Sequence, residues 1–220
     1  RIMLARAICQ EPEIIVLDEP TSYLDIRYKL ELLDILKRMA KEKGITVLMS
    51  LHEIDLAQKC ADRIVCVRGE EIMAYGTPEE VFHEETIEKL YDLDNGSYNP
   101  LSGSLELKKT EGEPEVFVIS SGGNGTPIYR KLQREGRPFA AGILYTNDVD
   151  YQAARVLASK IITEEPFEEI SDNTYKNAEN MIDQCQIVVN AGVHIGSCNH
   201  RMRNLLQYAQ EKGKLKRHYL

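Results

Sequence analysis

The chain has 220 residues, of which 43% are hydrophobic and 28% are charged, and its formal net charge at pH 7 is −8. These values are ordinary for a soluble protein of one large or two small domains, and the acidic excess, which lies in residues 1–100, offers no basic face to nucleic acid. No apolar run approaches the ~18 residues that a membrane-spanning helix needs. Five cysteines without a Cys-x-x-Cys spacing argue against a disulfide framework. We therefore expect a cytosolic polypeptide that does not bind nucleic acid.

The most informative stretch is residues 14–22, Ile-Ile-Val-Leu-Asp-Glu-Pro-Thr-Ser, which follows a helix predicted over residues 1–9. Its four apolar residues, three of them β-branched, predict a strand that is buried on both faces and ends at Asp18 and Glu19. Open α/β sheets bind their ligands at the carboxyl ends of their strands. At such an edge Asp18 can hold Mg²⁺, directly or through water, and Glu19 can orient or deprotonate an attacking water. The alternative is a strand that simply ends in two solvated acids.

A helix and a second strand follow this stretch. Asp25 is a good N-cap for a helix over residues 26–43, where apolar residues recur at helical spacing, and Gly44 ends it. Residues 45–50 predict a second buried strand, so the unit is strand, helix, strand, with parallel strands and a right-handed crossover. That arrangement places Glu19 and His52 at the same edge of the sheet. A lone histidine after a strand is by itself usually a polar surface residue.

Shorter elements complete this part of the chain. A helix is predicted over residues 53–61, followed by a hairpin over residues 63–75 that turns at Gly69. Thr77-Pro78-Glu79-Glu80 is a capping box with proline at the first helical position, and it predicts a short helix.

Taken together, these motifs resemble the ATP-binding-cassette (ABC) ATPases over residues 1–92: Leu17 to Ser22, then Leu24-Asp25, then a strand ending at Ser50 and His52. Residues 1–10 resemble the helix that follows the signature peptide of that family. The resemblance implies that Asp18 serves Mg²⁺ and that Glu19 is the catalytic carboxylate. It also implies that Asp25 communicates across a dimer and that His52 senses the γ-phosphate of ATP.

The resemblance also implies cofactors and partners. The segment Tyr75 to Val81 is similar to the corresponding ending of importers for iron-siderophore, haem and cobalamin. ATP and Mg²⁺ would be the cofactors, and the partners would be a second ATPase subunit in a homodimer and membrane permease subunits. The protein would be cytoplasmic, held at the inner face of the cell membrane through the permease.

One expected motif is missing from the sequence. No Gly-x-x-x-x-Gly-Lys-Ser/Thr phosphate loop occurs, and the only Gly-Lys pair, Gly213-Lys214, is followed by leucine. The signature peptide and the glutamine loop of the family would lie upstream of Arg1. We therefore expect the C-terminal piece of a longer protein, which should not hydrolyse ATP by itself.

Turn-forming residues between positions 92 and 114 mark a domain boundary. Beyond it, strands and helices alternate, which predicts a doubly wound parallel sheet. The predicted strands are 116–119, 140–145, 161–162 and 187–189, and the predicted helices are 127–135, 150–160, 174–185 and 199–212. The predicted fold class is α/β: a partial P-loop ABC ATPase domain over 1–92, a linker over 93–114, and a small Rossmann-like accessory domain over 115–220.

Glycines follow the first strand of this second domain, at Gly122, Gly123 and Gly125, with Thr126 next to them. Glycines between a strand and a helix let backbone N–H groups approach a phosphate, which favours a site for an unknown small ligand; a plain tight turn is the equal alternative. A strand order such as 3-2-1-4 would bring this loop against residues 190–194, in a crevice suited to a phosphate or another small anion.

Three other side chains near the C-terminus, His194, Cys198 and His200, are of metal-binding types but lack a recognised spacing, so loop and helix-cap roles are the alternative to a metal site.

Three functions agree with these patterns. The first is the ATPase subunit of an ABC importer whose C-terminal domain regulates it or senses a ligand. The second is a non-transport ABC protein of translation or DNA repair, and the third is a nucleotide-dependent enzyme domain fused to the cassette. The third lacks a clear nucleophile and base pair.

Overall fold

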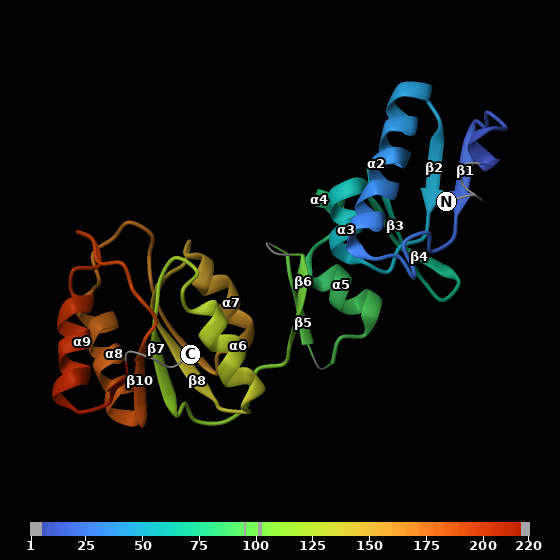
Figure 1. The fold of residues 1–220 in the computed structure, drawn as a ribbon. Helices are drawn as coiled ribbons and strands as arrows, with labels where there is room; N and C mark the ends of the chain where they lie inside the picture. The colour runs from blue at the N-terminus through green and yellow to red at the C-terminus, as the bar shows by residue number, and fades with distance from the viewer. Residues whose placement is uncertain (1–5, 95, 101–102, 217–220) are drawn as a thin grey trace. The chain divides into compact units, whose positions relative to one another are not determined.

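The computed structural model describes residues 6–94, 96–100 and 103–216, and the chain divides into two compact units (Figure 1). The first unit extends to Tyr91 and takes in residues 103–104, and the second holds the other described residues. The helix predicted over residues 1–9 lies partly outside the described residues, and its described end, residues 6–8, is helical.

The first unit begins with two parallel strands joined by a helix. Strand β1 (Ile14–Leu17) pairs in parallel with β2 (Thr46–Met49), and helix α2 (Ile26–Lys43) connects them. Asp25 caps α2 by accepting a hydrogen bond from the backbone N–H of Tyr28 at 3.1 Å, and Gly44 ends the helix with a φ of 66°. These two residues confirm the predicted helix start and stop.

The predictions that β1 is buried on both faces and that β2 is a buried strand are wrong for this structure. Ile15 is 4% exposed and packs with Met39 of α2, whereas Ile14 and Val16 of β1 and Leu48 of β2 are 57 to 70% exposed. The reason is that successive side chains of a strand point to opposite faces, and among the described residues only one face of this sheet is covered. Helix α2 covers one of those faces.

The remaining elements of the first unit are a hairpin and short helices. Helix α3 (Ile54–Cys60) precedes the antiparallel pair β3 (Ile64–Arg68) and β4 (Glu71–Gly76), and α4 (Pro78–Val81) and α5 (Glu84–Tyr91) follow. The predicted capping box of α4 is confirmed, because Thr77 and Glu80 exchange hydrogen bonds between side chain and backbone at 2.8 and 3.3 Å.

The segment predicted as a linker contains a strand pair. Strands β5 (Gly96–Asn99) and β6 (Ser104–Leu107) form a two-stranded sheet. Tyr98 is 1% exposed, and the carboxylate of Glu106 is largely buried and paired with Arg130 of the second unit's first helix. A segment rich in turn formers can thus still form strands when it packs against a neighbouring sheet-and-helix layer.

The second unit is a doubly wound parallel sheet of five strands (Figure 1). Its order is β11-β10-β7-β8-β9, so β7, β8, β9 and β10 follow the predicted order 3-2-1-4. The strands are β7 (Val116–Ile119), β8 (Phe139–Tyr145), β9 (Lys160–Glu164), β10 (Ile187–Asn190) and β11 (Leu215–Lys216), the last of which the sequence did not predict.

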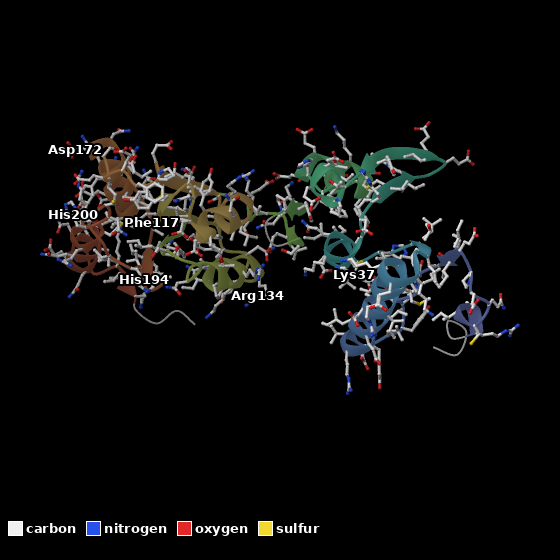
Figure 2. All side chains as sticks on the ribbon, turned by 90° about the horizontal axis from the view of Figure 1, so that it is seen from above. Lys37, Phe117, Arg134, Asp172, His194 and His200 are labelled. Carbon is white, nitrogen blue, oxygen red and sulfur yellow. The ribbon has the colours of Figure 1, made fainter. Side chains whose placement is uncertain are left out.

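Two helices cover each face of this sheet. Helices α6 (Thr126–Arg134) and α7 (Val149–Leu157) pack on one face, and α8 (Asp172–Gln184) and α9 (Met202–Glu211) on the other. Strand β7 is fully buried, and its Phe117 lies within the body of the unit while Asp172 and His200 lie at its surface (Figure 2). Among the helices of the described residues, none combines the length and apolar character that a membrane crossing requires.

Candidate functional site

Four polar residues meet at the carboxyl ends of β1 and β2. Asp18 and Glu19 follow β1, and Ser50 and His52 follow β2. The Nε2 atom of His52 lies 2.7 Å from Oε1 of Glu19. The predicted proximity of Glu19 and His52 is therefore confirmed, because parallel strands end at the same edge of their sheet.

Ser50 joins the two carboxylate residues. Its hydroxyl donates a hydrogen bond to Oδ1 of Asp18 at 2.7 Å and accepts one from the backbone N–H of Glu19 at 2.7 Å. The sequence pattern marks Ser50 only as the end of a strand, and nothing in that local pattern predicts a contact with a residue 31 positions away.

The backbone of Glu19 is in the left-handed region, with a φ of 42°. This conformation is uncommon for a residue with a side chain and is held here by the Ser50 contact and by Ser22, whose hydroxyl donates to Oε2 of Glu19 at 2.9 Å. The turn therefore directs the Glu19 carboxylate toward His52 rather than along the strand.

Hydrogen bonds from His52 and then Ser22 lower the pKa of the Glu19 carboxyl below its ordinary value of 4.5. Glu19 is consequently ionised at neutral pH, which both orienting and deprotonating a water molecule require. The side chains of His52 and Glu19 are 73% and 46% exposed, so a ligand can reach both.

Asp18 offers an exposed carboxylate that fits a magnesium ion. Mg²⁺ takes oxygen ligands and commonly keeps waters and substrate phosphates around one or two carboxylates. Within residues 6–94, 96–100 and 103–216, no group of three or more His, Cys, Asp or Glu side chains could hold a metal. The donor set at Asp18 thus suits an ion shared with waters and phosphates, and it does not form an all-protein cage.

Asp25 lies apart from this group of four. Its carboxylate caps α2 through the N–H of Tyr28, and its side chain is exposed. The structure assigns it a helix-capping contact, and its predicted communication across a dimer stays a prediction.

In the second unit, two loops meet at the carboxyl ends of the neighbouring strands β7 and β10. The helices that follow these two strands lie on opposite faces of the sheet. The backbone N–H of His194 donates to Oγ of Ser121 at 2.9 Å, and the side-chain amide of Asn124 donates to the carbonyl of Gly192 at 3.0 Å. The predicted neighbourhood of these two loops is therefore confirmed.

Carboxylates of the same unit accept hydrogen bonds from three backbone N–H groups of the glycine loop. The N–H of Gly122 donates to both oxygens of Asp148 at 3.0 Å. The N–H groups of Gly125 and Thr126 and the hydroxyl of Thr126 donate to Asp150 at 2.9 to 3.0 Å. An anion at these donors would have to displace both carboxylates, so the contacts favour the tight-turn interpretation. Ligand binding by Gly122, Gly123, Gly125 and Thr126 stays a prediction.

Gly125 is also required by packing. A Cβ atom at this position would lie 2.4 Å from Oγ of Ser120 and 2.6 Å from the hydroxyl of Tyr129. These two hydroxyls are buried and lie 2.6 Å apart, and burial raises the pKa of Tyr129. The glycine therefore serves the fold whether or not the loop binds a ligand.

His194, Cys198 and His200 do not form a metal site in the described part of the chain. The thiol of Cys198 donates to the carbonyl of Phe167 at 3.4 Å, and Nδ1 of His200 lies 2.8 Å from the carbonyl of Ser197. The labelled histidines are separated in Figure 2. The structure thus favours the loop and helix-cap alternative.

Comparisons with known proteins connect both units to described families. The model of the MJ0874 family matches residues 139–216. The uncharacterized ABC transporter ATP-binding protein MJ0873 of Methanocaldococcus jannaschii is 39% identical over 145 residues, which are 66% of this chain and 50% of that protein.

Two further relatives are named for the import or transport of a substrate. The cobalamin import ATP-binding protein BtuD of Halobacterium salinarum is 26% identical over 185 residues. The match covers 81% of this chain and 46% of BtuD. The ferric enterobactin transport ATP-binding protein FepC of Escherichia coli is 38% identical over 93 residues. The match covers 42% of this chain and 34% of FepC. The chain spans about half the length of the first two relatives and a third of the last.

Proposed function

We propose that this chain, whose homologues are ABC transporter ATP-binding proteins of the siderophore and cobalamin import types, is part of the ATP-hydrolysing subunit of an ABC importer. The observation that carries the proposal is the group at the ends of β1 and β2, where Glu19 lies against His52 and Ser50 joins Glu19 to Asp18.

Each residue of this group has a chemical task in ATP hydrolysis. Asp18 would hold Mg²⁺, which neutralises charge on the phosphates as the terminal phosphoryl group transfers. Glu19, ionised and held by Ser50, orients the attacking water and accepts its proton. His52 would contact the γ-phosphate of a bound ATP, as the resemblance to ABC ATPases implies.

The chain needs further elements to act. Its sequence contains no phosphate loop, and the backbone cradle and lysine of that loop bind the β- and γ-phosphates in P-loop ATPases. The apolar face formed by Ile14, Val16 and Leu48 is 57 to 70% exposed, although parallel strands are normally covered on both faces. Both facts, with the half-length match to the relatives, support a larger ATPase domain with elements outside these 220 residues.

The partners and location follow from this assignment. The complete subunit would pair with a second copy, with Asp25 near the dimer contact, and would bind membrane permease subunits at the cytoplasmic face of the membrane. The second unit would regulate hydrolysis or sense a small ligand. Its own sheet, its own two cores and its match to a separate family model support an accessory role.

The test uses the full-length subunit and the substitution Glu19→Gln. Glutamine keeps the shape and hydrogen bonding of the side chain but cannot accept a proton, so ATP turnover should fall by roughly 10²-fold while ATP still binds. His52→Ala should act similarly. The matched control is Glu42→Gln, which removes a carboxylate at the exposed end of α2.

Near-normal turnover of the Glu19→Gln subunit would overturn the proposed catalytic role. Removal of the residues after Tyr91 tests the accessory role separately, because a regulatory unit changes the turnover of the subunit when it is lost, and an unchanged rate would argue against regulation.

A further inference from the structure

The segment after β2 is anchored a second time, one residue beyond His52. We propose that Glu53 is a positioning residue that holds His52 against Glu19, an inference that rests on the proposed ATPase function. From the sequence alone, Glu53 is predicted only to start a helix.

The Glu53 carboxylate connects three segments of the first unit. Its Oε2 accepts a hydrogen bond at 2.9 Å from the hydroxyl of Thr21, which lies two residues after Glu19 and is 1% exposed. Its Oε1 accepts a hydrogen bond from the ammonium of Lys29, in the first turns of α2. One side chain thus ties the β2 end to the turn after β1 and to the helix between them.

The partners of Glu53 make this anchor stronger than an ordinary surface pair. The side chains of Lys29 and Glu53 are 23% and 29% exposed, so water screens their attraction only in part. The hydrogen bond from Lys29 lowers the pKa of Glu53 below its ordinary value of 4.5. Glu53 is therefore ionised at neutral pH and accepts both bonds as a carboxylate.

His52 depends on its flanking residues for its position. Its side chain is 73% exposed, and its contact with Glu19 is through one ring nitrogen. The backbone before it is fixed by Ser50, which hydrogen bonds to both residues after β1, and the backbone after it is fixed by Glu53. Loss of either anchor lets the imidazole move, and a displacement of about 1 Å can cost as much as 10²-fold in rate.

The experiment compares ATP hydrolysis by full-length subunits that carry Glu53→Ala, Glu53→Gln or Asp55→Ala. Glu53→Ala removes both hydrogen bonds and should lower kcat roughly tenfold, with the KM for ATP within about twofold of wild type. Glu53→Gln keeps the length and the acceptor oxygen, so it should restore kcat to within about threefold. Asp55→Ala is the matched control, because it removes a carboxylate two residues along that pairs with Lys59 on the surface.

A second arm removes the partner instead. Lys29→Met should also lower kcat. The double variant Lys29→Met with Glu53→Ala should have the same kcat as Glu53→Ala alone, because both changes break the same contact between Lys29 and Glu53. If the fold-loss in kcat of the double variant equals the product of the two single losses, the proposal is overturned.

The outcomes separate this inference from the proposed function. If Glu19→Gln abolishes turnover and Glu53→Ala retains wild-type kcat, positioning by Glu53 is wrong and the ATPase assignment stands. If Glu53→Ala raises KM, or lowers the unfolding temperature while kcat is unchanged, Glu53 serves binding or stability and the proposal is also overturned. If the Glu19→Gln subunit hydrolyses ATP normally, the catalytic role of Glu19 is wrong, and the proposal that Glu53 acts by holding His52 against Glu19 is overturned with it.

Discussion

Asp150 provides a test of what the glycine loop does. Its carboxylate is fully buried at the start of α7 and accepts hydrogen bonds from the N–H groups of Gly125 and Thr126 and from the hydroxyl of Thr126. If the loop is a tight turn held by this carboxylate, its removal should destabilise the second unit. If the loop is chiefly a ligand site, the same change should affect stability little.

The magnitude follows from the donors that lose their acceptor. Asp150→Ala leaves the buried N–H of Gly125 and the partly buried N–H of Thr126 without this acceptor, each worth about 1–3 kcal/mol, while the Thr126 hydroxyl can rotate toward another acceptor. The expected loss is about 2–6 kcal/mol. Asp150→Asn keeps the volume and one oxygen but places an amide N–H₂ against one backbone donor, so about 1–3 kcal/mol should be lost.

Calorimetric unfolding of the 220-residue chain measures this loss, with the transition of the second unit followed separately where the two units unfold independently. A loss of this size should lower that transition by roughly 4 °C per kcal/mol. Asp148→Asn is the control, because asparagine is as good an N-cap as aspartate and can still accept from Gly122.

Hydrogen exchange gives the local check, since the amides of Gly125 and Thr126 should lose protection in Asp150→Ala. An unchanged transition temperature together with unchanged exchange at these two amides would refute the structural role of Asp150. The two carboxylates would then be passive neighbours of a loop that is free to bind an anion.

Two further predictions concern binding and pH. Titration calorimetry of the 220-residue chain with Mg-ATP should show negligible binding, because the phosphate loop is missing from its sequence, and tight binding that Asp18→Ala abolishes would contradict this expectation. Hydrogen bonds from Lys212 and Tyr208 lower the pKa of Asp183 below its ordinary value of 3.8. The stabilisation they give is present above that value and is lost as the pH falls through the folded-state pKa, so NMR titration should find the Asp183 pKa higher in Lys212→Met, and an unchanged pKa would argue against the pair.

Local signals in the sequence predicted the elements well because the responsible contacts are local. The cap at Asp25, the stop at Gly44 and the capping box of Thr77 and Glu80 each involve residues within about one helical turn. The strand order of the second unit also followed from sequence, since right-handed crossovers leave few topologies for alternating strands and helices. The relation to ABC ATPases is confirmed by the relatives.

The side-chain contacts of Ser50 and Asp150 with distant residues could not be predicted from the sequence patterns. Ser50 bridges Asp18 and Glu19 across more than thirty residues, and Asp150 reaches Gly125 across 25. A serine after a strand and an aspartate at the start of a helix are both common for local reasons. Neither residue type therefore predicts a hydrogen bond to a distant residue. These two contacts are therefore visible only in the folded chain.

The strands β1 and β7 show what an apolar sequence pattern can and cannot predict about burial. Ile14 to Leu17 and Val116 to Ile119 are both short apolar runs that predict strands, and burial on both faces is predicted for the first. Strand β7 has helices on both faces of its sheet and is fully buried, whereas β1 has one helix and exposes Ile14 and Val16.

The same composition gives opposite exposure because burial depends on what else packs against the strand. An apolar run shows only that its residues are suited to burial. Whether they are buried depends on the helices or strands that pack over each face of the sheet. Exposing β-branched residues of a parallel pair to water forgoes about 25 cal/mol for each Å² of apolar surface that remains uncovered. The uncovered face of β1 and β2 and the absent phosphate-loop sequence are therefore independent observations, one structural and one chemical, that support the same proposal of a larger ATPase domain.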